Sequence, residues 1–212
     1  VVNIVKKMCH IWIGHLSPPL QWMDTWKEKH PDWDYYIFTD EMLHARQWHN
    51  QHLITKYYNQ GVYAGVADLI RYELLYEQGG FLPPADAVCL RNTDELFTAP
   101  EDHAYTVFES ETIVPNFISP IQACNPENTF VRMLIDELHK LRPEDLNPKP
   151  YKSTGNEWLS QFVPDKEKHK LVIWPSHYLI PRHFKKKHVY YDGPDPVYAD
   201  QMFGSTKNLY RK

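Results

Sequence analysis

The chain contains 212 residues, of which 42% are hydrophobic and 24% are charged, and its formal net charge is −4. This length suffices for one sizeable hydrophobic core, and the composition is typical of a globular protein rather than a disordered or fibrous one. A chain with a net negative charge is not expected to bind nucleic acids, because neutralising phosphates requires a basic surface. No apolar run approaches the roughly 18 residues of a membrane-spanning helix, so we expect no membrane span in this chain.

The three cysteines, Cys9, Cys89 and Cys124, are widely spaced and form no CxxC pair. An odd number of isolated cysteines is typical of reduced, buried thiols in a cytosolic protein, and not of a disulfide framework or a zinc site. The sequence therefore predicts free thiols.

The first predicted elements alternate between strand and helix. Residues 8–14 form a short apolar segment that ends at Gly14, as a buried strand does before a turn, and residues 20–30 space their apolar side chains along one helix face. Residues 33–40 are rich in aromatic side chains and predict a second strand that ends at Asp40. A strand, a helix and a strand within forty residues form a βαβ unit, which favours a parallel sheet.

The remaining pattern continues the alternation. Residues 62–80 predict the most regular helix, which Gly79-Gly80 terminate, and a strand is predicted over residues 81–90 although Pro83 and Pro84 lie in it. Helical pieces are expected at 41–60 and 94–97, and a strand at 104–110. A second strand is expected in segment 170–181, where Pro175 terminates it. Helices are expected at 128–141 and 155–163, and loops at 142–153 and in the tail from residue 188. The sequence therefore predicts one α/β domain.

Two acidic residues follow predicted strands. Asp40 and Asp86 lie where open α/β sheets bind ligands, beyond the carboxyl ends of the strands. The chain has no GxGxxG or GxxxxGK[ST] motif, so a bound nucleotide would need another partner for its phosphates, usually a carboxylate-held divalent cation. His44, His49 and His52 lack zinc-site spacing, and we interpret them as solvated.

Asp68 and Arg71 are three residues apart on the predicted helix 62–80 and therefore share a face. They form either an exposed ion pair, which contributes little to stability, or a partly buried pair that requires a partner or a ligand. Both interpretations stay open, although the surrounding apolar residues favour the second.

Three segments carry a resemblance to a known family. In order, IWIG (11–14), PDWDYYIFTD (31–40) and AGVADLIRYELLYEQGGFLPPADAVCL (64–90) resemble the DXD-containing glycosyltransferases of family 32. Length and segment order are also similar to glycosyltransferase domains of large DNA viruses that infect chlorella. The resemblance implies a single GT-A (Rossmann-like) domain over residues 1–212, with a central, mostly parallel mixed sheet flanked by helices. This domain is either the whole protein or the N-terminal part of a longer one.

The resemblance also implies a UDP-sugar donor and a Mn²⁺ or Mg²⁺ cofactor. The family's DXD acids would fall at positions 84 and 86, and only Asp86 matches, because Pro84 replaces the first acid. One carboxylate is expected to hold the cation more weakly than two. A C-terminal metal-binding segment of the family corresponds to residues 200–208, where Gly204-Ser205 match and Asp200 would be a second metal ligand, or else a surface acid.

For the donor, the resemblance places Asp68 and Arg71 against the sugar and the diphosphate. It places Trp12 and Ile13 against the uracil, although Trp12 is equally interpreted as a core ring. These residues, together with Asp86, form the implied donor-binding set.

On the acceptor side, the resemblance implies roles for Glu109 and Asn116. A catalytic base near the acceptor hydroxyl would be Glu109 or Asp200, and the choice stays open, as does the stereochemistry of transfer.

The leading prediction is a metal-assisted transferase that moves a hexose or 6-deoxyhexose from a UDP-sugar to a glycan or glycoprotein acceptor. The alternative is a nucleotide-sugar or glycan-binding module that lost turnover with the acid at position 84. A metal-dependent hydrolase is the least favoured interpretation. Without a membrane anchor, we expect a cytoplasmic location, which for a viral protein means the host-cell cytoplasm.

Overall fold

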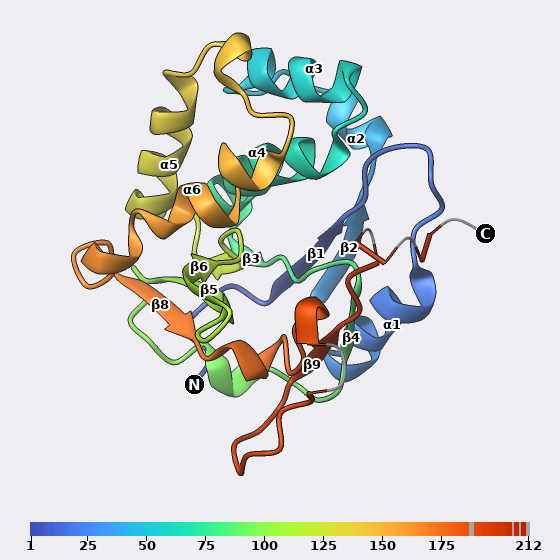
Figure 1. The fold of residues 1–212 in the computed structure, drawn as a ribbon, viewed down its shortest axis with the longest axis vertical. Helices are drawn as coiled ribbons and strands as arrows, with labels where there is room; N and C mark the ends of the chain where they lie inside the picture. The colour runs from blue at the N-terminus through green and yellow to red at the C-terminus, as the bar shows by residue number, and fades with distance from the viewer. Residues whose placement is uncertain (187–188, 205, 208, 211–212) are drawn as a thin grey trace.

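The computed structural model describes residues 1–186, 189–204, 206–207 and 209–210. A central sheet has the strand order β2-β1-β3-β7-β5-β6, and β8 also pairs with β5 (Figure 1). Its strands are β1 (Lys7–Ile11), β2 (Asp34–Phe38), β3 (Gly80–Phe81), β5 (Ala104–Ser110), β6 (Val114–Ile118), β7 (Ala123–Cys124) and β8 (Leu171–Trp174). The predicted α/β fold with a mixed central sheet is thereby confirmed.

Parallel pairs do not predominate in this sheet. β1 pairs in parallel with β2 and β3, and β5 with β8, whereas β7 is antiparallel to β3 and β5, and β6 is antiparallel to β5. β6 is antiparallel to β5 because it returns from β5 through a tight turn, which needs no crossover helix.

Helices cover both faces of the sheet. They are α1 (Leu20–Lys29), α2 (Asp40–His44), α3 (Gln51–Asn59), α4 (Tyr63–Gln78), α5 (Thr129–His139) and α6 (Asn156–Ser160). Alternate side chains of a strand point to opposite faces. Cys9 and Ile11 of β1 accordingly pack in a core shared with α3 to α6, while Met8 packs with Trp26 of α1.

The predicted strand over residues 81–90 is wrong as a continuous element. β3 ends at Phe81, and β4 (Ala87–Cys89) belongs to a separate two-stranded sheet with β9 (Ala199–Gln201). Pro83 and Pro84 have no N–H to donate to a ladder, so they end the first strand. β9 itself lies in the tail that the sequence predicts as loop, and its pairing brings the tail back beside β4 (Figure 1).

α4 is the central helix of the fold. Nine of its sixteen residues are buried, among them Leu69 and Ile70, so this helix is enclosed by neighbours on most sides. Glu73 is also buried, and its carboxylate accepts hydrogen bonds from the backbone N–H groups of His49 and Asn50 at 2.8 and 2.9 Å. These bonds satisfy donors at the start of α3, which would otherwise be unpaired.

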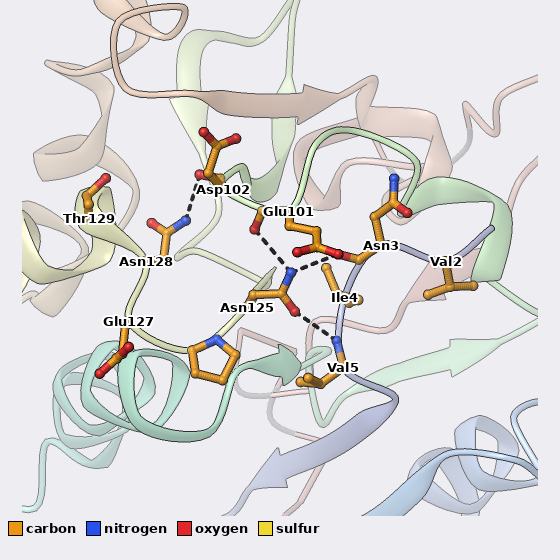
Figure 2. A pocket seen from close by; sticks show the side chains of 11 residues that line it. Val2, Asn3, Ile4, Val5, Glu101, Asp102, Asn125, Glu127, Asn128 and Thr129 are labelled. Carbon is orange, nitrogen blue, oxygen red and sulfur yellow. Dashed lines mark hydrogen bonds between the residues drawn. The ribbon is translucent and has the colours of Figure 1, made fainter.

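The two edges of the sheet differ in chemistry. At the amino ends of β1 and β5, Asn125 is one of the residues that line a cavity of about 600 Å³ (Figure 2). The Asn125 side chain accepts from Val5 N at 3.0 Å and donates to the carbonyl oxygens of Asn3 and Glu101 at 2.7 and 3.1 Å. Its amide therefore ties backbone segments together, and the candidate residues of the sequence analysis lie elsewhere.

All three cysteines are buried and free, as predicted. Burial raises the pKa of the Cys9 and Cys89 thiols to about 12, so these groups stay protonated at neutral pH and act as small apolar side chains. Among the described residues, no helix is both long enough and apolar enough to cross a membrane.

Gly80 lies so close to β1 that a side chain there should reduce the stability of the protein. Its φ is +94°, and a Cβ there would lie 2.2 Å from the carbonyl oxygen of Lys7 in β1. We expect Gly80→Ala to destabilise the protein by at least ~2 kcal/mol, since both backbone strain and a collision with a neighbouring strand arise. Denaturant unfolding measures this change.

Gly61→Ala is the matched control. Gly61 has a φ of +68° but nothing within 4 Å of an added Cβ. We therefore expect a cost of about 1 kcal/mol from the left-handed backbone alone. Equal costs for the two substitutions would contradict the assignment of a close β1–β3 approach.

Candidate functional site

A cavity of about 280 Å³ lies at the carboxyl ends of β3 and β5. Its lining comes from segments far apart in the sequence and includes Arg71, Pro84, Glu109, Asn156, Ile180 and Phe203. We call it the Arg71 cavity. It occupies the edge at which α/β sheets bind ligands.

Arg71 brings a buried positive charge to this cavity. Its side chain is only 9% exposed, and one terminal nitrogen donates to the carbonyl oxygens of Leu82 and Ile121, the latter at 3.4 Å. Its Nε has no hydrogen-bond partner among the described residues. A buried guanidinium that is bonded only to neutral carbonyl groups is suited to an anionic ligand.

Asp68 has a different role from its neighbour. Its Oδ2 accepts a hydrogen bond from Thr154 Oγ1 at 2.9 Å, and Tyr72 donates to the Thr154 carbonyl at 2.6 Å. Burial raises the pKa of the Asp68 carboxyl to about 6, because the charged form loses its hydration. Asp68 therefore supports the segment that leads into α6, and the exposed ion pair with Arg71 is not the arrangement found.

Glu109 lies near the end of β5 and is held from two sides. Asn156 Nδ2 at the start of α6 donates to Oε2 at 2.9 Å, and His183 Nε2 lies 2.9 Å from Oε1. The N–H of Lys185 donates to His183 Nδ1 at 3.2 Å, which assigns the imidazole proton to Nε2 and makes His183 the donor. Each carboxylate oxygen keeps a free lone pair.

Asp86 follows the Pro84 position and contacts the tail. Its Oδ1 accepts from Gln201 Nε2 at 2.6 Å, and its Oδ2 accepts from Gly204 N at 2.8 Å. Burial raises the pKa of this carboxyl above its usual value. Neutral groups of the tail thus surround a desolvated carboxylate, an environment that a cation would stabilise.

Asp200 does not share this environment. Both of its oxygens accept from Arg182, at 3.2 and 2.9 Å. Asp200 lines neither the Arg71 cavity nor the cavity that adjoins it. Arg182 therefore already neutralises Asp200, and its role as a metal ligand or catalytic base stays a prediction. Ser205, which matches the family's C-terminal metal-binding segment, lies outside the described residues.

The donor set for a divalent cation is therefore small. In the described part of the chain, no group of three or more His, Cys, Asp or Glu side chains converges as a metal site. Mg²⁺ is commonly held by one or two carboxylates together with substrate phosphates and water. Asp86 fits this mode as a single carboxylate, and Asp200 does not add a second.

The remaining predicted residues lie outside the Arg71 cavity. Ile13 is buried in the core, whereas Trp12 is half-buried after β1, donates to the Leu16 carbonyl at 2.6 Å and meets the Tyr210 ring edge-to-face at 5.0 Å. Asn116 is exposed in β6. The prediction for Trp12 at the uracil stays open.

Asp40 is structural. Its two carboxylate oxygens accept from the N–H of Gly14 and the hydroxyl of Tyr58, each at 2.9 Å. It therefore fixes the turn after β1 and contributes no free carboxylate to the cavity.

A second cavity of about 530 Å³ adjoins the first and shares Glu109 and Ile180 with it. Its other lining residues include Glu111, Ser176, His177, Arg182 and Tyr191. We call it the His177 cavity. Glu109 is thus reached from both sides.

Comparison with known proteins finds similarity to glycosyltransferases. Residues 20–105 match the family described as glycosyltransferase sugar-binding region containing DXD motif. This segment of the chain is similar to the sugar-binding region of these glycosyltransferases. The matched region includes Asp68, Arg71 and Asp86, and it ends before Glu109.

Two solved glycosyltransferases resemble the protein in structure. The PaToxG glycosyltransferase has a TM-score of 0.61 and 15% identity, covering 77% of this chain and 70% of its own, which supports a shared fold. A glycosyltransferase involved in the glycosylation of the major capsid of PBCV-1 has a TM-score of 0.46 and 12% identity, covering 96% of this chain and 97% of its own. No curated protein matches the sequence.

The raised pKa of Asp68 should make the stability of the protein depend on pH. Its folded-state pKa of about 6 exceeds the ordinary 3.8, so the folded protein binds more protons than the unfolded chain between these values. Stability from this group is complete below pH ~4 and is lost as pH rises through about 6. Asp68→Asn should remove this slope and stabilise the protein at pH 7 by on the order of 2 kcal/mol.

Urea unfolding across pH 4 to 8 measures the effect. Asp34→Asn, which replaces an exposed acid of β2, controls for the loss of one negative charge. Parallel pH profiles for wild type and Asp68→Asn would contradict the assignment.

Proposed function

We propose that the protein transfers a hexose or 6-deoxyhexose from a UDP-sugar to a glycan or glycoprotein acceptor, assisted by a divalent cation. The observation that carries the proposal is the Arg71 cavity, which combines a buried guanidinium with a firmly held carboxylate, Glu109, at the ligand-binding edge of the sheet. The glycosyltransferase family supports a sugar donor.

The leaving diphosphate needs positive charge near it. Mn²⁺ or Mg²⁺, when bound, supplies Lewis acidity to the diphosphate. Asp86 is the residue that would hold the cation. Arg71 contributes a preorganised positive charge that needs no rearrangement during the reaction, and with Pro84 in place of an acid it takes a larger share of this role.

Glu109 is the proposed base. The acceptor oxygen forms a bond to the anomeric carbon, the bond from that carbon to the phosphate oxygen breaks, and UDP leaves with the electron pair. The hydroxyl proton passes to Glu109. Asn156 and His183 fix the carboxylate in position, so that its remaining lone pairs face the cavities.

A binding module without turnover is the second candidate. It is favoured by one observation, that Gln201 and Gly204 of the tail already bond both oxygens of Asp86. Such a module would bind the nucleotide-sugar equally well with and without a divalent cation.

Incubation with a panel of UDP-hexoses and UDP-6-deoxyhexoses tests the two candidates. With Mn²⁺, the transferase releases UDP, and Asp86→Ala weakens Mn²⁺-dependent UDP binding at least ~10-fold. The control Asp200→Asn should leave the Mn²⁺ dependence unchanged, because Arg182 occupies that carboxylate. UDP binding that is indifferent to Mn²⁺, without UDP release from any donor, would select the binding module.

A further inference from the structure

The His177 cavity is the strongest unassigned feature of the molecule. It is larger than the Arg71 cavity, about 530 against 280 Å³, and the two share Glu109 and Ile180. A ligand in the His177 cavity therefore reaches the same carboxylate as a donor sugar in the Arg71 cavity.

One wall of this cavity carries a fixed pair of rings. His177 and Tyr191 are stacked, with their centroids 4.0 Å apart and an angle of 10° between the planes. The Tyr191 hydroxyl donates to Asp195 Oδ2 at 3.2 Å, and its backbone N–H donates to the Pro181 carbonyl at 2.7 Å. The ring also packs on Gly193, where an added Cβ would lie 2.2 Å from the hydroxyl. A flat, immobilised ring pair is suited to packing against the apolar face of a sugar.

The polar lining favours a neutral, hydroxyl-rich ligand. Glu111 accepts from Ser176 N and Oγ at 2.8 and 2.6 Å, and Glu109 accepts from side-chain N–H groups, so both carboxylates keep lone pairs for hydroxyl donors. Arg182 is paired with Asp200. A phosphate ligand would need unpaired cations, whereas here Lys186 is the remaining cation among the described lining residues, and it is exposed.

We propose that the His177 cavity binds a neutral sugar unit of the acceptor, packed on the His177–Tyr191 pair with one hydroxyl directed to Glu109. This inference rests on the proposed transferase function and narrows its acceptor to a glycan. The protein would then extend an existing sugar rather than modify an amino-acid side chain.

Saturation-transfer NMR with methyl glycosides of glucose, galactose, mannose and xylose tests the proposal, with and without UDP. We expect at least one glycoside to bind wild type, and Tyr191→Ala and His177→Ala to weaken it about ten-fold while leaving UDP affinity unchanged. Tyr190→Ala replaces the neighbouring tyrosine, which is 44% exposed and does not line the cavity, and should bind as wild type.

The proposed function and the assignment of the His177 cavity are contradicted by different results. Absence of UDP binding counts against the proposed function. Absence of glycoside binding to wild type, or unchanged glycoside affinity in the correctly folded Tyr191→Ala variant, overturns the assignment of this cavity even where UDP still binds.

Discussion

The carboxylate of Glu109, held between two N–H donors, is the interaction on which the site depends. Asn156 bonds one oxygen and His183 the other, so the end of β5 is joined to the start of α6 and to the segment after β8. Three separate segments thereby define one wall between two cavities. Loss of either donor would free the carboxylate to rotate, and the placement that the proposed base requires would be lost.

The support for this wall comes from α4. Asp68 bonds Thr154, two residues before Asn156, so the helix that places Arg71 in the cavity also positions a donor to Glu109. This arrangement destabilises the charged form of Asp68, because burial raises the pKa of its carboxyl. Local instability of this kind is common at binding sites, where groups are arranged for a ligand and not for stability alone.

Periodicity in the sequence predicts α1, α4 and α5 well, because their apolar spacing is local information. It predicts a single strand over 81–90 wrongly, since the ending of β3 and the pairing of β4 with the distant β9 depend on tertiary contacts. The resemblance implies one site for Arg71 and Asp86, and in the structure Arg71 lines the Arg71 cavity. Asn156 and His183 could not be found in this way, because they lie 47 and 74 residues from Glu109 and neither belongs to a local motif.

The residues at positions 84–86, where the family has its DXD triplet, lie beside the Arg71 cavity and the tail. Pro84 ends a strand and lines the Arg71 cavity, while Asp86 remains as a desolvated carboxylate beside the tail. In the proposed function, positive charge for a diphosphate would come from Arg71 and from a cation held by Asp86. Glu109, which lines both cavities, is the proposed base.

The most direct measurement is the turnover of Glu109→Gln with a UDP-sugar that wild type accepts. The substitution keeps the shape of the side chain and removes its basicity. The account predicts that kcat falls by at least ~100-fold while the dissociation constant of the UDP-sugar stays within a few-fold of wild type. An unchanged kcat would contradict the central role of this carboxylate.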